Sequence, residues 1–402
     1  MLTVEYNPFD PQVHANPHPI YHRLRAEEPV HWSEILDAWV LTRYHDVVAV
    51  LTDRRFSADR RQAQNRLVQE ALKIQEQFRP FDRAATMLNS DPPEHTRLRR
   101  LVSRAFTPRM VESRRPHIQE IVDGLLDSLQ ESGRLDVIRD LAYPLPVIVI
   151  AEMLGVPPQD RGHFKRWSDD IVAALGGPLL PAEVLEKARR GVQEMADYLR
   201  NVIDQRRWDP AEDLLSALTA AEEQGQVLSE DELLATCVLL LVAGNETTTD
   251  LIGNGMLALV DNPDQMQKLR NDPSLIESAV EELLRYDGPA QMTSRVAMAD
   301  VKIGGREVKK GQLVFAVLAA ANRDPAQFSN PDELDIGRRD NPHVAFGEGT
   351  HFCLGAPLAR AEGQIAIATL LRRIPHMRLD SDKMEWGGSF ILRGLNSLPV
   401  AF

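Results

Sequence analysis

The sequence predicts a mainly α fold with a small β region, organised as one domain over residues 1–402. Helical periodicity dominates residues 94–286, whereas strand-like segments are few and lie near 30–60 and within 290–402. One helical pattern continues for roughly 32 residues, or about 48 Å at 1.5 Å per residue, which is long for a helix in a compact domain. We therefore expect a helical body crossed by one long helix, with the β segments at its edges.

Composition limits the classes of function. The formal net charge of −13 argues against nonspecific binding to nucleic acid and to an anionic membrane surface. The segment Met1–Arg25 lacks the apolar stretch of a signal peptide, and the longest apolar run, Leu233–Gly244, is too short to cross a bilayer. Two cysteines leave no disulfide framework. We expect a cytoplasmic protein that acts without a membrane and without nucleic acid.

Short strands are predicted on either side of the helical body. Ala38–Thr42 is one such segment. Val301–Val308 has the pattern of a hairpin whose turn is a Gly-Gly pair. Leu313–Val317 is a further apolar strand.

The long helix has a clear start and a clear end. Ser229 and Glu232 have the S-x-x-E spacing of a capping box ahead of an apolar run. The helical pattern continues to about Val260, and the Asn-Pro pair at 262–263 ends it. Cys237 lies in the apolar run and is interpreted as an ordinary core residue.

The middle of this helix, residues 243–248, departs from the apolar pattern. Gly244 costs roughly 0.5–1 kcal/mol relative to alanine. Thr247 suits a helix interior when its hydroxyl donates to the carbonyl of Ala243. We expect an opened hydrogen-bond ladder and a groove for a diatomic ligand and water, with Glu246 and Thr247 as an acid–alcohol pair that delivers protons. Taken alone, the same residues also fit a solvated polar face.

The segment Phe346–Gly355 combines glycines, aromatic residues and a cysteine, and packing of a hydrophobic core does not require this combination. It holds Cys353, and its three glycines allow positive φ and a close approach of the backbone. A helical pattern follows, so the thiol lies near a helix N-terminus, where backbone N–H groups and the helix dipole favour a thiolate. A bound metal ion would deprotonate the thiol outright.

Other interpretations of this segment depend on spacing. A dinucleotide-binding G-x-G-x-x-G would need a glycine where Phe352 stands. An iron–sulfur cluster needs four cysteines, and the chain has two. A phosphatase-like C-x5-R would need its arginine at Ala359, one position before Arg360. A buried structural cysteine beside a glycine-rich turn is the plainest alternative.

Two polar pairs lie on other predicted helices. One helix begins at the Asp-Pro pair at 272–273, with Asp as N-cap, and ends before Gly288. It carries Glu282 and Arg285 three residues apart on one face. His95 and Arg99 lie one helical turn apart. Each pair is also common on solvated helix surfaces.

Together these residues resemble the cytochrome P-450 monooxygenases. Residues 346–355 have the F-G-x-G-x-H-x-C-L-G pattern of the haem-binding loop, and 243–247 match A-G-x-E-T. Residues 282–285 match E-x-x-R, and the segments 322–328 and 331–338 resemble the stretch that adds a second arginine to it. The resemblance covers nearly the whole chain, with all signatures in family order. It implies the triangular-prism P-450 fold with a long central distal helix and haem b as cofactor.

The resemblance also assigns roles to individual residues. Cys353 is implied to be the axial iron ligand, Glu246 and Thr247 the proton-delivering pair, and Glu282, Arg285 and Arg338 a structural network. The implied haem contacts are His95, Arg99, Ala243, Gly244, Arg295, Phe346, His351, Cys353 and Gly355. The implied substrate-pocket walls are Met87, Leu88, Leu179, Val242, Asn245, Gln291, Met292, Phe390 and Ile391.

The implied function is that of a bacterial haem-thiolate monooxygenase. It would insert one atom of O2 into a C–H bond of a lipophilic small molecule such as a fatty acid, terpenoid, steroid or polyketide-like compound. No flavin or nicotinamide domain is evident, so electrons would come from a separate ferredoxin and ferredoxin reductase, or from a flavodoxin-type donor. We expect the donor to dock on a basic face with Arg104, Arg109 and Arg360, and the protein to be a monomer. The alternatives are an H2O2-driven peroxygenase and a non-catalytic haem-binding sensor.

Overall fold

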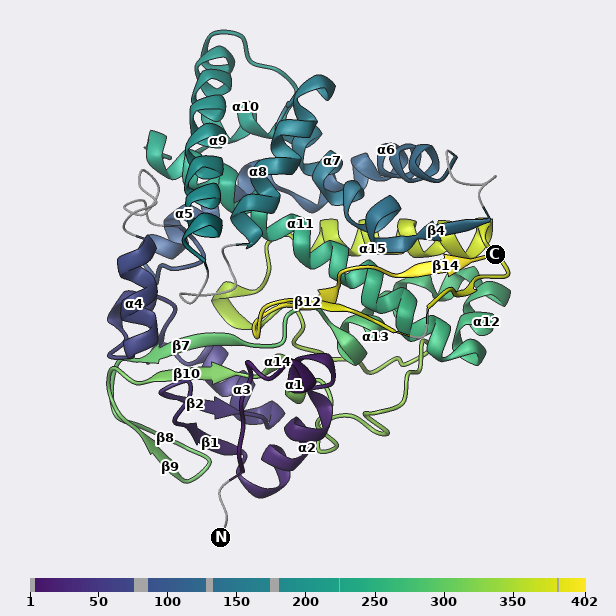
Figure 1. Cartoon of the computed structure of the whole chain (residues 1–402). Coiled ribbons are helices and arrows are strands. Elements are labelled where there is room, and N and C mark those ends of the chain that lie inside the picture. The colour runs from purple at the N-terminus through teal and green to yellow at the C-terminus, as the bar shows by residue number, and fades with distance from the viewer. Residues whose placement is uncertain (1–3, 76–85, 128–132, 174–180, 224, 382) are drawn as a thin grey trace.

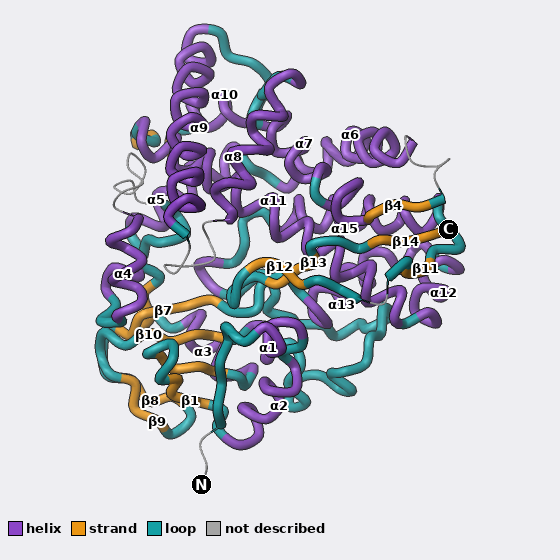
Figure 2. The backbone as a smooth tube through the Cα atoms, viewed as in Figure 1, coloured by secondary structure: helices purple, strands orange, loops and turns teal. Residues whose placement is uncertain are grey.

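The structure is a computed structural model that describes residues 4–75, 86–127, 133–173, 181–223, 225–381 and 383–402 (Figure 1). Most of these residues are helical. The largest sheet lies at the lower left of Figure 2, apart from the long helices at the top. The predicted class, a mainly α protein with a small β region, is confirmed. Within the described ranges, no helix is both long and apolar enough to span a bilayer.

The α-helices follow one another along the whole chain. They are α1 Pro11–Ala15, α2 His18–Glu27, α3 Tyr44–Thr52, α4 Arg66–Gln75, α5 Glu94–Ala105, α6 Pro108–Asp127, α7 Pro144–Met153, α8 Arg161–Ala173, α9 Ala182–Trp208, α10 Leu214–Ala220, α11 Glu230–Asp261, α12 Pro263–Asn271, α13 Ile276–Asp287, α14 Leu318–Ala321 and α15 Ala356–Arg373.

The strands form one five-stranded sheet and several smaller pairings. The five-stranded sheet has the order β1 Val30–Ser33, β2 Ala38–Leu41, β10 Leu313–Ala316, β7 Thr293–Ala297 and β3 Phe56–Ser57. A three-stranded sheet holds β11 Arg378–Leu379, β14 Pro399–Ala401 and β4 Arg134–Asp136. The hairpins are β5 Glu222–Glu223 with β6 Gln226–Val227, β8 Val301–Ile303 with β9 Arg306–Val308, and β12 Trp386–Gly388 with β13 Arg393–Leu395.

The three named strand segments agree with this topology, whereas the placement of strands only near 30–60 and 290–402 is wrong, because β4, β5 and β6 lie within 94–286. The predicted strands at 38–42 and 313–317 are β2 and β10, which pair in parallel, with Phe315 opposite Val40. The predicted hairpin is β8–β9, with Val301 opposite Val308. Both glycines of its turn have positive φ, which a side chain would make costly.

The predicted long helix is α11, which has 32 residues and runs through the middle of the molecule (Figure 1). Its capping box is present: Ser229 Oγ accepts from the N–H of Glu232, and Glu232 Oε2 accepts from the N–H of Ser229. The predicted opening of the helix at 243–248 is wrong, because α11 continues through this segment without a break. Thr247 Oγ1 donates to the Ala243 carbonyl at 2.8 Å, as predicted, and this bond is made within helical geometry.

Close packing fixes α11 against α13 and α15. A Cβ atom on Gly255 would lie 3.1 Å from a methyl carbon of Leu283, and one on Gly363 would lie 3.1 Å from a methyl carbon of Leu251. These residues belong to or adjoin the main hydrophobic core, which surrounds α11. The two glycines at these contacts therefore allow the three helices that carry the predicted motifs to lie close together.

The start of the helix that carries Glu282 differs from the prediction. Asp272 accepts from the N–H of Ser274 at 3.1 Å, but the turn it caps is a 3₁₀ turn, Pro273–Leu275, and α13 begins only at Ile276. The helix ends at Asp287, as predicted.

Candidate active site

The loop around Cys353 is a tight turn that leads into α15. The N–H of Cys353 donates to the Phe346 carbonyl at 2.9 Å, and a 3₁₀ turn, Gly349–His351, lies between them. Gly347 and Gly349 have φ of 73° and 74°, and a Cβ on Gly349 would lie 3.0 Å from the Leu51 carbonyl oxygen. Glycine is thus required at these positions for the loop to close.

The two cysteines lie in different surroundings. Cys237 is fully buried in the core of α11, and burial raises the pKa of its thiol to about 12. Cys353 is exposed, although enough protein surrounds it for burial to raise its pKa. The backbone N–H groups of Gly355 and Ala356 and the charges of Arg99 and Arg360 act in the opposite direction and favour the thiolate. Of the two cysteines, Cys353 is therefore the one that a ligand can reach, and the groups around it oppose part of the effect of burial.

The middle of α11 has an open face. Ala243 is exposed, and a Cβ added to Gly244 would meet no atom within 4 Å. Burial raises the pKa of Glu246 to about 7. At neutral pH the carboxyl group of Glu246 is therefore about half protonated, and Glu246 directly precedes Thr247 in the chain. Small side chains at 243 and 244 thus leave this face of an intact helix open.

Four predicted haem contacts from three parts of the chain form a basic cluster. The rings of His95 and His351 lie 4.2 Å apart, and His95 Nε2 is buried with no hydrogen-bond partner among the described residues. Burial lowers the pKa of His351 to about 4, with Arg295 and His95 adding to the effect. Burial, assisted by Arg60, lowers the pKa of Arg295 to about 10. Burial also lowers the pKa of Arg99.

Among the described residues, little negative charge lies within this basic cluster. Asp91 is the acid that acts on His95, Arg295 and His351, and its oxygens already accept from Ser57 and Ala58. With the pKa values of His95 and His351 lowered, the positive charge at neutral pH is carried by the arginines, Arg99 and Arg295. Desolvated cations without anionic partners are costly, so the cluster fits a ligand that carries more than one negative charge. Arg60 belongs to this cluster, and no motif in the sequence marks it.

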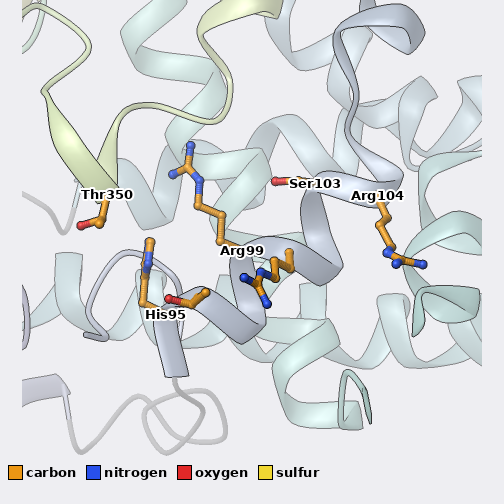
Figure 3. Close-up of a pocket in the computed structure, with 7 residues that line it drawn as sticks. His95, Arg99, Ser103, Arg104 and Thr350 are labelled. Carbon is orange, nitrogen blue, oxygen red and sulfur yellow. The ribbon is translucent and has the colours of Figure 1, made fainter. Parts of the chain in front are cut away.

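A hollow of about 450 Å³ adjoins the cluster (Figure 3). In Figure 3, His95 and Arg99 lie on the side of Thr350, whereas Arg104 lies at the opposite end of the helix. The residues that line the hollow are His95, Thr96, Arg99, Arg100, Ser103, Arg104 and Thr350.

The structural network is assembled as predicted. Glu282 and Arg285 are fully buried and joined by two hydrogen bonds of 2.8 Å. Arg338 Nε donates to Glu282 Oε2 at 3.0 Å. Arg285 also donates to the carbonyls of Asn322, Pro331 and Glu333, which the sequence did not indicate. The network therefore fixes the long segment between β10 and the Cys353 loop.

The predicted pocket walls have different environments. Met87 and Met292 are buried, Leu88 is exposed, and Val242 and Ile391 are half-buried. Phe390 packs edge-on against Phe9 and Phe315. Leu179 lies outside the described residues.

Two predicted polar anchors of the pocket make other contacts. Asn245 was expected to face the pocket, but it is buried and its amide donates to Ser168 of α8 at 3.0 Å. It lies roughly 200° around the helix from Ala243, because successive residues are about 100° apart. Gln291 is also buried, and its amide donates to the Gly288 carbonyl at 3.0 Å. Asn245 thus lies on another face of α11 than Ala243, whereas Oε1 of Gln291 has no hydrogen-bond partner among the described residues, so the role of Gln291 in the pocket stays a prediction.

Two buried acids near this region were not predicted from the sequence. Glu362 of α15 is buried, its pKa is raised to about 8 by burial, and it interacts with the Thr248 hydroxyl. Asp250 lies one turn after Glu246, and burial and the Glu246 charge raise its pKa. A lone acid within a helix is ordinarily solvated, so neither position gave a signal in the sequence.

Comparison with known proteins identifies the class of this fold and site. A profile of the cytochrome P450 family matches residues 37–385. The chain belongs to the cytochrome P450 family, and its fold is the cytochrome P450 fold.

Individual relatives cover almost the whole chain. Cytochrome P450 CYP107DY1 of Priestia megaterium is 46% identical over 372 residues, which are 91% of this chain and 90% of that protein. The structure of PksS, a cytochrome P450 of the bacillaene polyketide synthase of Bacillus subtilis 168, matches with a TM-score of 0.90 at 40% identity, covering 99% of both chains. P450BioI in complex with an acyl carrier protein ligated to hexadec-9Z-enoic acid matches with a TM-score of 0.87 at 40% identity, covering 98% of this chain and 100% of that one.

Members of this family are monooxygenases that bind haem b through a cysteine thiolate. The residues present fit that group. One accessible thiol lies before a helix N-terminus, and buried basic side chains gather where an anionic group would be neutralised.

Proposed function

We propose that this chain is a monooxygenase that inserts one atom of O2 into a C–H bond of a lipophilic small molecule, with Cys353 as the axial ligand of haem b. The observation that carries the proposal is the accessible thiol in a glycine-framed loop, with two backbone N–H groups and two arginines favouring its anionic form. When bound, the haem activates O2, and the thiolate favours O–O cleavage.

The basic cluster would hold the haem carboxylates. Arg99 and Arg295 carry positive charge that two propionates would neutralise, and His95 and His351, whose pKa values are lowered, would donate ring N–H groups to them. Phe346 and Gly355 belong to the loop itself, and Ala243 and Gly244 leave room above α11. These residues orient the cofactor and take no part in bond breaking.

Glu246 and Thr247 would deliver protons. An acid with a pKa of about 7 both donates and regains a proton at neutral pH. The Thr247 hydroxyl is fixed by its bond to the Ala243 carbonyl, so its oxygen can accept a hydrogen bond in one defined position. A peroxide-driven enzyme does not need such a pair, which favours O2 as the oxidant.

The substrate is proposed to be a lipophilic acyl or polyketide-like molecule. Apolar walls at Met87, Val242, Met292 and Phe390 support this class. The names of two relatives, a polyketide synthase cytochrome P450 and a P450 bound to an acylated carrier protein, point in the same direction. A screen of free and carrier-bound fatty acyl chains, macrolactones and steroids would find the class by the haem spectral change on binding.

Oxygen consumption separates the proposed function from its alternatives. With reductant, a ferredoxin system and a substrate found in the screen, a monooxygenase forms one product per O2 consumed. A peroxygenase forms product with H2O2 and not with the electron donor. A haem-binding sensor binds the same ligands and forms no product with either oxidant.

Electrons are proposed to arrive from an acidic ferredoxin or flavodoxin-type donor at the basic end of α5. Arg100 and Arg104 line the hollow there, and Arg109 follows at the start of α6. Arg360 was expected to join this surface, but it is paired with Glu281, so we replace it with Arg100. The chain as a whole is acidic, so docking would depend on this local positive charge.

Charge reversal on this surface is expected to slow reduction. In Arg100→Glu and Arg109→Glu, the rate of first electron transfer from an acidic ferredoxin at low salt should fall on the order of tenfold, because attraction between the two surfaces is lost. Raising the ionic strength should slow the native protein and leave the variants little changed. Stopped-flow reduction measures both, with Arg189→Glu on α9 as control. Equal rates for all proteins at every salt concentration would contradict this docking surface.

A further inference from the structure

Glu281 and Arg360 form a two-pronged ion pair beside the Cys353 loop. Arg360 Nε donates to Glu281 Oε1 at 2.6 Å, and a terminal guanidinium nitrogen donates to Oε2 at 2.7 Å. His343 Nε2 lies 3.1 Å from the same Oε2. Glu281 belongs to α13 and Arg360 to α15, so the pair joins the helix of the structural network to the helix that follows Cys353.

Arg360 also contacts the loop through an aromatic ring. Its guanidinium carbon lies 4.7 Å from the centre of the Phe346 ring. The carbonyl of Phe346 accepts the N–H of Cys353 at 2.9 Å. The Phe346 residue thus links the two groups: its ring lies under the Arg360 guanidinium, and its carbonyl holds the backbone of Cys353.

Stability alone does not account for this arrangement. Glu281 and Arg360 are each about one-third exposed, with side-chain exposures of 29% and 30%, and such ion pairs contribute little to folding. The neighbouring Glu282 network, which is fully buried, already fixes α13 to the segments beyond it. The Glu281 carboxyl is shared between Arg360 and His343, because both side chains contact its Oε2.

We propose that the Arg360–Glu281 pair sets the reduction potential of the bound haem by controlling how much positive charge acts on the Cys353 thiolate. The inference rests on the proposed function, in which Cys353 binds the iron. Positive charge near the thiolate withdraws electron density and favours the ferrous state, which forms when ferric haem accepts one electron from the donor protein. Glu281 offsets part of this charge. Both are positioning residues that act through Cys353, and neither touches the substrate.

Opposite substitutions in the pair should move the potential in opposite directions. In Arg360→Gln the ferric/ferrous potential should fall, because one positive charge is lost and Glu281 is left uncompensated. In Glu281→Gln it should rise, because Arg360 is no longer neutralised. Each shift should reach up to about a tenfold change in the reduction equilibrium, which is 59 mV for one electron. The double variant should lie near the native value.

Spectroelectrochemical titration of the haem-loaded proteins measures these potentials. Arg360→Lys keeps the charge and loses the two-pronged geometry, so its potential should stay near the native one, whereas Arg189→Gln, in an exposed ion pair on α9, should leave it unchanged. The inference is overturned if both single variants shift in the same direction, if neither shifts, or if Arg360→Lys shifts as far as Arg360→Gln.

The carbon monoxide spectrum of the reduced protein separates this inference from the proposed function. Every variant that shows the red-shifted Soret band of thiolate ligation still has the proposed ligand, so an unchanged potential in those variants overturns only the role of the pair. Absence of that band in the native protein would instead overturn the assignment of Cys353 and, with it, the basis of the inference.

Discussion

Glu246→Gln is expected to slow product formation by about 10²-fold or more, the usual scale for the loss of a positioned proton donor. The glutamine is nearly isosteric and cannot give up a proton. Haem content and substrate binding should remain native. Product formation by the native protein should also decline as the pH rises above about 7, because the protonated form of Glu246 is lost above its pKa. This decline should be absent in Glu246→Gln.

Thr247→Ala tests the other half of the pair. The variant should still bind haem and substrate and still consume O2, but product per electron should fall and H2O2 should appear, because protons arrive without ordered delivery. Thr219→Ala is the matched control, since Thr219 Oγ1 makes the same bond to the carbonyl four residues earlier, at 2.7 Å, on α10. Unchanged coupling in Thr247→Ala would mean that water or substrate supplies the protons, and the proposed role of the pair would be withdrawn.

Glu282→Ala is expected to destabilise the folded protein by roughly 3–5 kcal/mol. The substitution removes the acceptor of Arg285, Arg338, Asn341 and the Asp335 N–H, and it leaves the guanidinium of Arg285 buried without a counter-ion. Little soluble haem-loaded protein should be recovered. Chemical denaturation of the material that is recovered, against the native protein, measures the loss.

Glu277→Ala is the control for that substitution. Glu277 is exposed in the first turn of the same helix, so its loss should change stability little. If Glu282→Ala matched the control in yield, haem content and denaturation midpoint, the network would have no role in holding the fold.

Local sequence patterns predicted most of the elements that position the site. The Ser229–Glu232 capping box, the Gly-Gly hairpin turn and the helix end before Gly288 each depend on neighbours within a few residues, and each was correct. The Thr247 bond to the Ala243 carbonyl was predicted for the same reason. The inferred break in α11 failed because the local cost of Gly244 is small beside the packing of a helix buried along much of its length.

Residues that depend on tertiary contacts were predicted less well. The Asn245 side chain is held by a hydrogen bond to Ser168, which is 77 positions away in the chain. The positive charge of Arg360 suggested a docking surface, but Glu281, which belongs to another helix, forms an ion pair with it. Glu362, Asp250 and Arg60 carry no local signal at all. Their surroundings exist only once α11, α15 and the sheet are packed.

The most direct test of the whole account is the spectrum of the reduced, carbon monoxide-bound protein in three forms: native, Cys353→Ser and Cys237→Ser. The strongly red-shifted Soret band of thiolate ligation is expected in the native protein and in Cys237→Ser, because Cys237 is a buried core residue. The band should be lost in Cys353→Ser. A band that persists in Cys353→Ser and disappears in Cys237→Ser would contradict the assignment of Cys353 as the iron ligand.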